Sequence, residues 1–267
     1  MPIKRIGILS IRENPSYDEV AGRFARAVEA AGGICVSGPD YTGCDVLAVI
    51  GGDGSILSAL EESLRLDVPI LGVNMGRVGY LTETQVGDIE RDVGCLLSGQ
   101  YRIEERMLLE ARSGDASGVA LNEVSFKNAA GAVGILSLEV SSHEAVIDRF
   151  SGDGLVIATA TGSTAYSLSA GGPILSPELD CLVLTPVCPH MLRARPVVIS
   201  ANETVRVRVT DNRAVARILL DGRRSLPDSA GRDGVLVRRA AAKARFVRIS
   251  RRNFYDLLHE KLSDWKH

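Results

Sequence analysis

Apolar residues in the first hundred positions gather in short, nearly continuous runs that polar segments separate. Such runs predict strands that are buried on both faces of a parallel sheet. We expect strands at 3–11, 34–37, 45–50 and 68–74. Between the first two strands, apolar residues from Tyr17 to Ala31 recur at helical spacing, and Gly32-Gly33 ends that helix.

Strands that alternate with helices predict an α/β domain with a Rossmann-like parallel sheet over residues 1–100. Ligands of such sheets bind at the carboxyl ends of the strands. The first strand is followed by Arg12-Glu13-Asn14-Pro15 and not by GxGxxG, so the sequence argues against an ordinary dinucleotide oxidoreductase.

The pattern changes near residue 101, from where short β-forming runs follow one another with turn residues between them. The expected strands are 101–111, 119–127, 134–140, 144–148, 154–159, 182–186, 204–209, 215–220 and 234–239. A helical interruption is expected near 164–171. Residues 101–250 are therefore predicted to form a mostly antiparallel β domain, with turns such as Asp221-Gly222.

Residues 251–267 return to a helical pattern. An apolar stripe is formed by Phe254, Leu257, Leu258 and Leu262, with Trp265 beyond it. A lone amphipathic helix needs an apolar surface to cover, so we expect this helix to pack back on the first domain.

A basic run precedes and enters this last segment. It consists of Arg238, Arg239, Lys243, Arg245, Arg248, Arg251 and Arg252. A solvated strand edge is the first interpretation, and an anionic ligand or partner is the alternative.

Composition narrows the class of protein. The chain has 267 residues, a net charge of −2 and 4% aromatic residues, so we expect neither nucleic acid nor membrane as a partner. It shows no signal peptide and no apolar run near the roughly 18 residues of a membrane span. Its 5 cysteines contain no CxxC pair, which favours a reducing, cytoplasmic location. Cys188-Pro189-His190 is too small a set for a metal site, and we expect none.

The segment Gly51-Gly52-Asp53-Gly54-Ser55 joins a predicted strand to a predicted helix. Glycines let the backbone approach a ligand, and a helix N-terminus favours anions, so Gly51, Gly52, Gly54 and Ser55 are candidate phosphate-binding residues. An aspartate beside phosphates is repelled unless a cation or a proton transfer is involved. The segment therefore indicates phosphoryl transfer, with Asp53 as metal partner or base. A plain glycine turn is the structural alternative.

Two later segments carry candidate ligand contacts. Asn122-Glu123 interrupts an apolar run, and its carboxylate could accept hydrogen bonds from both hydroxyls of a ribose; a turn-forming Asn beside an exposed Glu is the structural alternative. Residues 152–173 contain a dense run of small and hydroxyl residues, in which Tyr166 could offer a ring face to a base. Helix capping by Ser163 or Thr164 explains part of this run but not its length.

In order and spacing, these segments resemble the NAD kinase family. The matching motifs are GGDGS at 51–55, the strand at 69–74 with Gly76 and Gly79-Tyr80-Leu81, Asn122-Glu123, Asp153-Gly154 and TGSTAYSLSAGGP from 161. GGDG also occurs in phosphofructokinases and in diacylglycerol-type lipid kinases, but its combination with TGSTAY is specific.

The resemblance implies phosphorylation of the adenosine-ribose 2′-hydroxyl of NAD by ATP, with Mg²⁺ or another divalent cation accompanying ATP. It implies that Asp53 is catalytic and that Asn122 and Glu123 contact the nicotinamide-side ribose. The NAD-binding residues implied are Gly54, Asn122, Glu123, Asp153, Thr161, Thr164, Ala165, Tyr166 and Ser169. It also implies a homodimer or homotetramer, in which Asp153 contacts a ligand across a subunit interface.

Two positions depart from the family pattern: Ala160 stands where proline is usual, and Ser55 where threonine is frequent. Alanine loosens the backbone before Thr161, whereas serine keeps the hydroxyl. Two rival functions stay open, namely a lipid or sugar kinase that shares GGDG and a non-catalytic NAD-binding sensor. NAD or NADH as acceptor, ATP or polyphosphate as donor, and feedback by NADP(H) are open as well.

Overall fold

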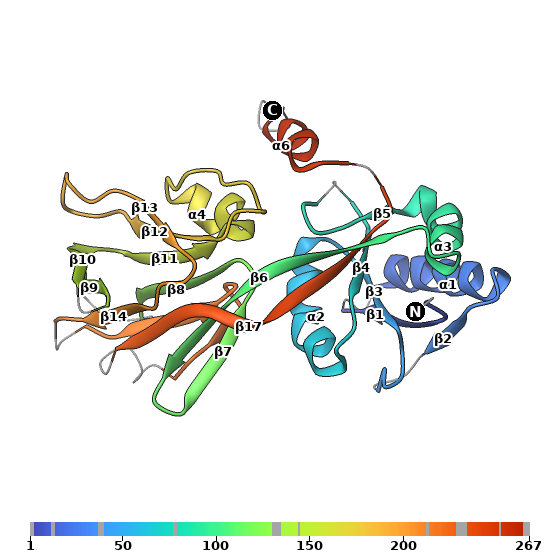
Figure 1. The fold of residues 1–267 in the computed structure, drawn as a ribbon, viewed down its shortest axis with the longest axis horizontal. Helices are drawn as coiled ribbons and strands as arrows, with labels where there is room; N and C mark the ends of the chain where they lie inside the picture. Colours follow the sequence, from blue (N-terminus) through green and yellow to red (C-terminus); the bar gives the residue numbers. More distant parts are fainter. Residues whose placement is uncertain are drawn as a thin grey trace. The chain divides into compact units, whose positions relative to one another are not determined.

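The fold is that of a computed structural model, which describes residues 3–11, 14–36, 40–76, 79–129, 135–143, 145–211, 214–227, 234–250 and 252–263. The predictions that involve Arg12, Glu13, Ser37, Gly134, Glu144, Arg251 and Trp265 fall outside these ranges. The chain divides into two compact units, Met1–Glu105 with Ala244–His267, and Arg106–Lys243 (Figure 1). These boundaries differ from those predicted at 100 and 250, because one strand runs without a break from residue 235 to residue 248.

The first unit is built on a parallel sheet. Its strands lie in the order β4 (Ile70–Asn74), β3 (Val46–Ile50), β1 (Arg5–Ser10) and β2 (Ile34–Val36), with β5 (Thr84–Gln85) beside β4. Each of these pairings is parallel, which confirms the predicted α/β domain.

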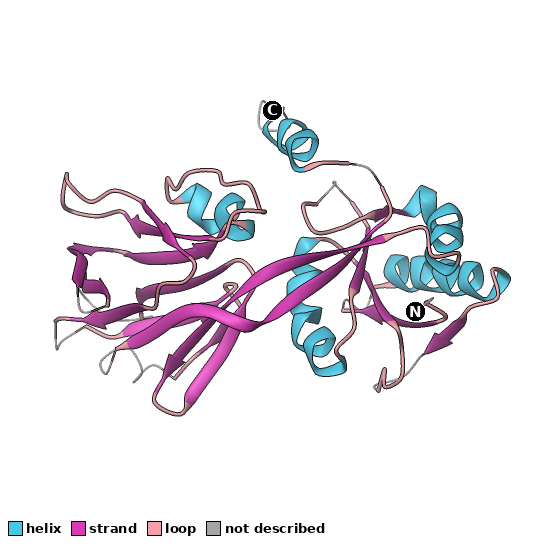
Figure 2. Cartoon of the chain, viewed as in Figure 1, coloured by secondary structure: helices cyan, strands magenta, loops and turns pink. Residues whose placement is uncertain are grey.

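Helices cover both faces of this sheet, as Figures 1 and 2 show. α1 (Pro15–Ala30) and α3 (Ile89–Leu97), which follows a 3₁₀ turn η1 (Val86–Asp88), pack in one cluster with Ala48 and Ile50. The intervening Leu47 and Val49 face the opposite side, since alternate strand residues point to opposite faces. α2 (Asp53–Leu66) lies there, and its Ile56 approaches Gly72, where a side chain would also meet the backbone of Thr82.

Local sequence sets the ends of α1. Asn14 caps the helix, since its Oδ1 accepts a hydrogen bond of 3.0 Å from the Ser16 N–H, and Pro15 occupies the first turn. Gly32, at φ 82°, takes the left-handed conformation that ends a helix at little cost.

The second unit is a β-sandwich. One layer has the strand order β13 (Val197–Ser200), β12 (Cys181–Val187), β11 (Gly154–Thr159), β8 (Glu123–Asn128), β15 (Ala216–Leu220) and β16 (Arg224–Ser225). The other has the order β10 (Ala145–Gly152), β9 (Leu136–Ser142), β14 (Val205–Val209) and β17 (Val235–Arg248), and β6 (Arg102–Ser113) pairs with β7 (Ala116–Ala120). The pairings within the sandwich are antiparallel, which confirms the predicted β domain.

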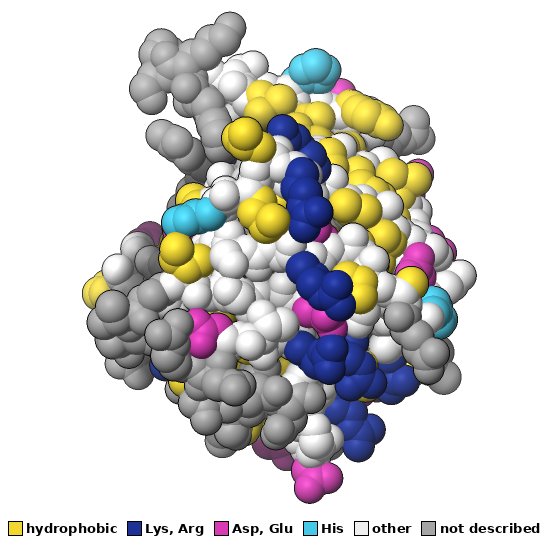
Figure 3. Space-filling view, turned by 90° about the vertical axis from the view of Figure 1, so that its left-hand side faces the viewer, with side chains coloured by type: hydrophobic (Ala, Val, Ile, Leu, Met, Phe, Trp, Pro, Cys, Tyr) yellow, Lys and Arg dark blue, Asp and Glu magenta, His cyan; other side chains and the backbone are white. Residues whose placement is uncertain are grey.

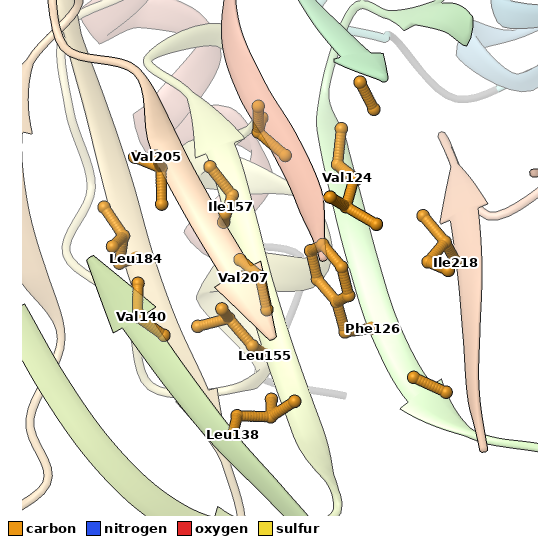
Figure 4. Packing of buried hydrophobic residues seen from close by; sticks show 14 of the residues in the cluster. Val124, Phe126, Leu138, Val140, Leu155, Ile157, Leu184, Val205, Val207 and Ile218 are labelled. Carbon is orange, nitrogen blue, oxygen red and sulfur yellow. The ribbon is translucent and has the colours of Figure 1, made fainter. Parts of the chain in front are cut away.

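Apolar side chains of the two layers meet in one core (Figure 4). Val124, Phe126 and Leu155 point inward from the first layer, and Val140 and Val207 from the second. The outer face of the first layer carries a smaller cluster around Val156, Ala158 and Val183. Short helices η2 (Thr161–Thr164) and α4 (Tyr166–Ser169) follow β11, and Tyr166 packs against this outer cluster.

Three predicted elements differ in extent. The run 119–127 is two strands, β7 and β8, because the backbone turns at Leu121-Asn122. The helix expected near 164–171 is the 3₁₀ turn η2 followed by the single turn of α4. The strand expected at 234–239 continues to Arg248 as β17. Strand β13 was not predicted.

The last helix, α6 (Phe254–Ser263), belongs to the first unit by its contacts, as predicted. Its Phe254 ring lies 6.2 Å from the ring of Tyr80, and Lys261 lies 5.7 Å from that ring. The helix buries none of its described side chains. The predicted apolar stripe therefore contacts the first unit without becoming part of its buried core. Within the described ranges, no helix is both long and apolar enough to cross a membrane.

The basic run does not lie on a free strand edge, because β17 pairs with β14, β4 and β6, but Arg238, Lys243 and Arg252 are exposed, as a solvated face predicts. Arg238 pairs with Glu110 at 2.9 Å, and Arg245 pairs with Asp67 at 2.6 Å. Arg248 is buried and lies against Glu83 and Glu104. These three arginines therefore pair with acids of their own unit.

Candidate active site

The GGDG segment forms a tight turn between β3 and α2. Gly51 has φ 146°, and a side chain there would overlap the Ser55 hydroxyl, so the turn needs glycine at this position. Hydrogen bonds of α2 begin with the Ser55 N–H, which donates to the Gly52 carbonyl at 2.8 Å. The N–H groups before it are those that a helix leaves to a ligand or to water. Ser55 is buried under Gly51, whereas Gly52 and Gly54 are half-buried.

Asp53 is the first residue of α2, and its carboxylate is held by the loop that follows β4. Oδ2 accepts the Tyr80 N–H at 2.9 Å, and Oδ1 accepts the Leu81 N–H at 3.0 Å. A side chain at Gly79 would overlap Oδ1, so this loop can close on the carboxylate only with glycine there. Each carboxylate oxygen keeps capacity for another hydrogen bond or a cation. Burial and the charge of Asp53 raise the pKa of Tyr80.

In the second unit, Asn122 ends the backbone turn and Glu123 is the first residue of β8. Glu123 is 6% exposed, and its Oε2 is buried without a hydrogen-bond partner among the described residues. Burial, followed by the charge of Asp221, raises the pKa of the Glu123 carboxyl to about 7. A buried acceptor without a donor is an expected property of a group that receives its donors from a ligand.

The TGST turn lies directly against this pair. The Thr159 hydroxyl donates to the Leu121 carbonyl at 2.7 Å and accepts the Gly162 N–H at 3.0 Å. A side chain at Gly162 would overlap the Asn122 carbonyl, so glycine permits this approach. Asn122, Glu123 and the turn from Thr161 onward are therefore brought together.

The structure separates the hydroxyl groups of this segment into two sets. Ser163 and Ser167 are fully buried and bind Ala160, Leu175 and Thr185. The hydroxyl residues Thr161 and Thr164 are half-buried and Ser169 is exposed, and Ala165 between them is half-buried. The second set contains the residues predicted to bind NAD, and the first supports the turn.

Ala160 has φ −58°, a value that proline would also impose. The φ of Ala160 is therefore one that proline at this position could also adopt.

Tyr166 offers only part of its ring to a ligand. The Lys127 Nζ lies 4.2 Å from the ring centroid, so this ammonium group occupies one face by a cation–π contact. Lys127 also lowers the pKa of Glu123, against the larger effect of burial.

Replacing Tyr166 with Ala is expected to raise the KM for NAD by about 5- to 150-fold, which corresponds to the roughly 1–3 kcal/mol of a base stacked on an aromatic ring. Steady-state kinetics at saturating ATP measure this change. Tyr166→Phe should keep the wild-type KM, and Tyr255→Ala on the exposed face of α6 is the matched control. An unchanged KM in a folded Tyr166→Ala protein would make Tyr166 a packing residue only.

Within one chain, Asp153 lies away from Asn122, Glu123 and the turn that begins at Thr161. It precedes β11, whereas Thr161 follows it, and six residues of strand span roughly 20 Å. Asp153 is exposed, and the Cys188 thiol hydrogen-bonds to it, which raises the pKa of Cys188. A contact between Asp153 and the same NAD molecule would therefore have to come from another copy of the chain.

Several residues around the site were not singled out from the sequence. They are Thr159, Lys127 and Asp221, and also Arg106, whose guanidinium lies 3.5 Å from the Thr161 hydroxyl. Asp221-Gly222 was recognised only as a turn, and no local signal connects it with Asn122. Among the described residues, no group of three or more His, Cys, Asp or Glu side chains could hold a metal ion.

Comparison with known proteins connects both units to one family. The family model described as ATP-NAD kinase N-terminal domain matches residues 39–101, and the one described as ATP-NAD kinase C-terminal domain matches residues 121–249. The NAD kinase of Desulforamulus reducens is 41% identical over 84% of this chain and 78% of its own length. That of Symbiobacterium thermophilum is 42% identical over 92% of this chain and 87% of its own.

Two solved structures share the fold. Yeast NADH kinase complexed with NADH has a TM-score of 0.85 at 22% identity, covering 100% of this chain and 89% of that one. An NAD kinase from Archaeoglobus fulgidus in complex with ATP has a TM-score of 0.80 at 23% identity, covering 97% of this chain and 99% of that one. The family models cover both units and the bacterial relatives most of the chain, and on these grounds the chain belongs to the NAD kinase family.

Proposed function

We propose that this chain is a phosphotransferase that transfers the γ-phosphate of ATP to the adenosine-ribose 2′-hydroxyl of NAD, which yields NADP. The observation that carries the proposal is the Asp53 carboxylate, fixed by two backbone N–H groups at the N-terminus of α2. In a plain phosphate cradle, a carboxylate at this position would repel the phosphates. It suits a group that accepts the proton of an attacking hydroxyl or contacts a cation.

The two units contribute different parts of this chemistry. The glycine turn of the first unit supplies N–H groups for the phosphates of ATP, which enters as its complex with Mg²⁺ or another divalent cation. In the second unit, Asn122 and Glu123 bind the nicotinamide-side ribose, and the turn from Thr161 to Tyr166 binds the adenosine.

A coupled assay tests the function. The purified chain is given Mg²⁺ and ATP with NAD, NADH, sphingosine or fructose 6-phosphate as acceptor. NADP formation, read with an NADP-specific dehydrogenase, is expected with NAD, and a parallel reaction with polyphosphate tests the donor. Phosphorylation of the lipid or the sugar alone would establish the rival kinase. NAD binding without transfer would establish the sensor.

We further propose that the chain works in the cytoplasm as a homodimer or homotetramer. The thiols of Cys35, Cys44, Cys95, Cys181 and Cys188 are free, which suits a reducing compartment. β13 is an edge strand with Val197 and Val198 exposed, and Leu192 nearby in the chain is 94% exposed. Figure 3 shows a face on which hydrophobic side chains gather beside Lys and Arg. An apolar edge strand of this kind supports pairing with a second copy.

Mixing two inactive variants tests whether Asp153 acts across copies. Asp53→Asn and Asp153→Ala chains are each expected to be weakly active, and co-refolding them should restore part of the activity. A mixed assembly contains sites with an intact Asp53 from one chain and an intact Asp153 from the other. Light scattering gives the mass of the assembly. A fully active monomer, or no recovery in verified mixed assemblies, would contradict the proposal.

A further inference from the structure

Asp221 is bound to the backbone of the Asn122-Glu123 pair. Its Oδ2 accepts the Leu121 N–H at 2.9 Å, and its Oδ1 accepts the Asn122 N–H at 2.7 Å and the Glu123 N–H at 3.1 Å. The Asp221 N–H donates in return to the Glu123 carbonyl at 2.9 Å. One carboxylate thus receives three successive N–H groups of the turn between β7 and β8.

We propose that Asp221 is a positioning residue for NAD, which fixes the backbone from Leu121 to Glu123 so that both side chains of the pair meet the ribose. The proposal rests on the proposed function of Asn122 and Glu123 and adds a residue to it. Asp221 touches no reacting atom, and its action passes through the backbone of this turn.

The opposite side of the turn is held by a different group. There the Thr159 hydroxyl donates to the Leu121 carbonyl, and the Thr159 N–H donates to the Asn122 carbonyl at 2.9 Å. Asp221 thus binds the N–H groups of the turn, and Thr159 binds its carbonyls. With both sets of backbone groups held, the Asn122 and Glu123 side chains leave the turn in fixed directions.

A carboxylate serves all three N–H groups of the turn, but it does so beside a second buried acid. Asp221 is 8% exposed and Glu123 is 6% exposed, so two carboxyl groups are buried next to each other. Burial raises the pKa of Asp221, with the three N–H groups and Arg223 acting in the opposite direction. A fold that only needed the turn would avoid this repulsion, whereas local conflicts of this kind are typical of functional sites.

The charge of Asp221 also affects the ionisation of Glu123, and so its capacity to accept hydrogen bonds from a ribose. The groups that act on Glu123 are Asp221, Lys127 on its own strand, and the backbone of Tyr166 on α4. The two ribose hydroxyls would supply the donors that Oε2 lacks, and an ionised Glu123 accepts both. The KM for NAD should therefore fall as Glu123 ionises, at a pH that burial raises most and the charge of Asp221 raises further.

The test uses Asp221→Asn, which suits the site because asparagine tolerates the left-handed backbone of Asp221 at φ 51°. An amide has one acceptor oxygen, so at least one N–H loses its partner. We expect the KM for NAD to rise about 10- to 100-fold, with kcat changed much less and the KM for ATP unaltered. The pH at which the KM for NAD falls should shift downward.

Asp67→Asn is the matched control, since Asp67 has the same left-handed backbone, at φ 55°, and lies exposed at the end of α2. It should keep all wild-type values. A rise in the KM for NAD with an unaltered KM for ATP separates positioning from a loss of folded protein, because a smaller folded fraction lowers the apparent kcat without raising one KM alone.

A second variant keeps the proposal testable where Asp221→Asn does not fold. Asp221→Gly suits the left-handed backbone and opens space for a small carboxylate. Formate is expected to lower the KM for NAD in this variant, and sodium chloride at equal ionic strength is not. The proposal is overturned by a folded Asp221→Asn protein with the wild-type KM and pH profile, or by Asp221→Gly without a formate effect where Asp221→Asn does not fold.

These failures differ from failure of the proposed function. A wild-type chain that makes no NADP refutes the kinase assignment. The calorimetric affinity of wild-type, Asp221→Asn and Asp67→Asn proteins for NAD then still decides the role of Asp221.

Discussion

Asp53→Asn is expected to lower kcat by about 10²- to 10⁴-fold, the usual contribution of a general base, while NAD still binds. The amide cannot accept the proton of the 2′-hydroxyl. The structure adds a cost in stability, since both Asp53 oxygens accept backbone N–H groups and an amide offers one acceptor. Loss of one such hydrogen bond costs about 1–3 kcal/mol. The kinetics are therefore compared at a temperature where both proteins are folded.

Asp67→Asn, at the other end of α2, is the control for this substitution. It should retain the wild-type kcat. If Asp53→Asn loses affinity for NAD and keeps its kcat, Asp53 is a binding group. Turnover near that of the wild type would leave the turn as a phosphate cradle alone and remove Asp53 from the mechanism.

Glu123→Gln is expected to abolish a large part of the pH dependence of stability. The pKa of Glu123 rises from 4.5 to about 7 on folding. Below pH 4.5 the carboxyl is protonated in both states. As the pH rises towards 7, the unfolded chain ionises first, so the folded state loses stability. The shift corresponds to about 3 kcal/mol, complete above pH 7. Glutamine does not titrate. The free energy of unfolding of the variant should therefore rise relative to that of the wild type by this amount between pH 4.5 and pH 7.

Chemical unfolding of both proteins across this pH range measures the difference. Glu90→Gln is a control of opposite sign, because Arg23 lowers the pKa of Glu90 to about 2. The stability that Glu90 contributes is present above pH 4.5 and is lost only as the pH falls from there towards 2. Its difference from the wild type should therefore stay flat where that of Glu123→Gln grows. A flat difference for Glu123→Gln would mean that Glu123 is solvated in solution.

The sequence predicted those parts of the fold that depend on local pattern. The strands of the first unit are apolar runs buried on both faces, and Gly32 and Asn14 mark the ends of α1 by their own conformation and side chain. The break between β7 and β8 was not visible, because the group that holds it, Asp221, lies 100 residues from Leu121 in the sequence. The full length of β17 was missed since Arg and Ala residues interrupt its apolar alternation.

The same limit applies to the site. The motifs brought Asn122, Glu123 and Thr161 to attention, and the structure places them together. The sequence could not separate Ser163 and Ser167, which are buried and bind the protein itself, from Thr161 and Thr164, since all four are hydroxyl residues in one run. Likewise, only the structure shows that Lys127 covers one face of Tyr166.

The course of β17 has a consequence for synthesis of the chain. Phe246 pairs with Ile70 of β4. Val247 is buried in the core of the first unit, together with Ile3 and Ile6 from the N-terminal end of the chain. A ribosome therefore releases all of the second unit before the first receives its last strand. The first 105 residues are made before Val247 joins their core, and a transcript truncated shortly before codon 244 would yield a chain whose first unit lacks Phe246 and Val247.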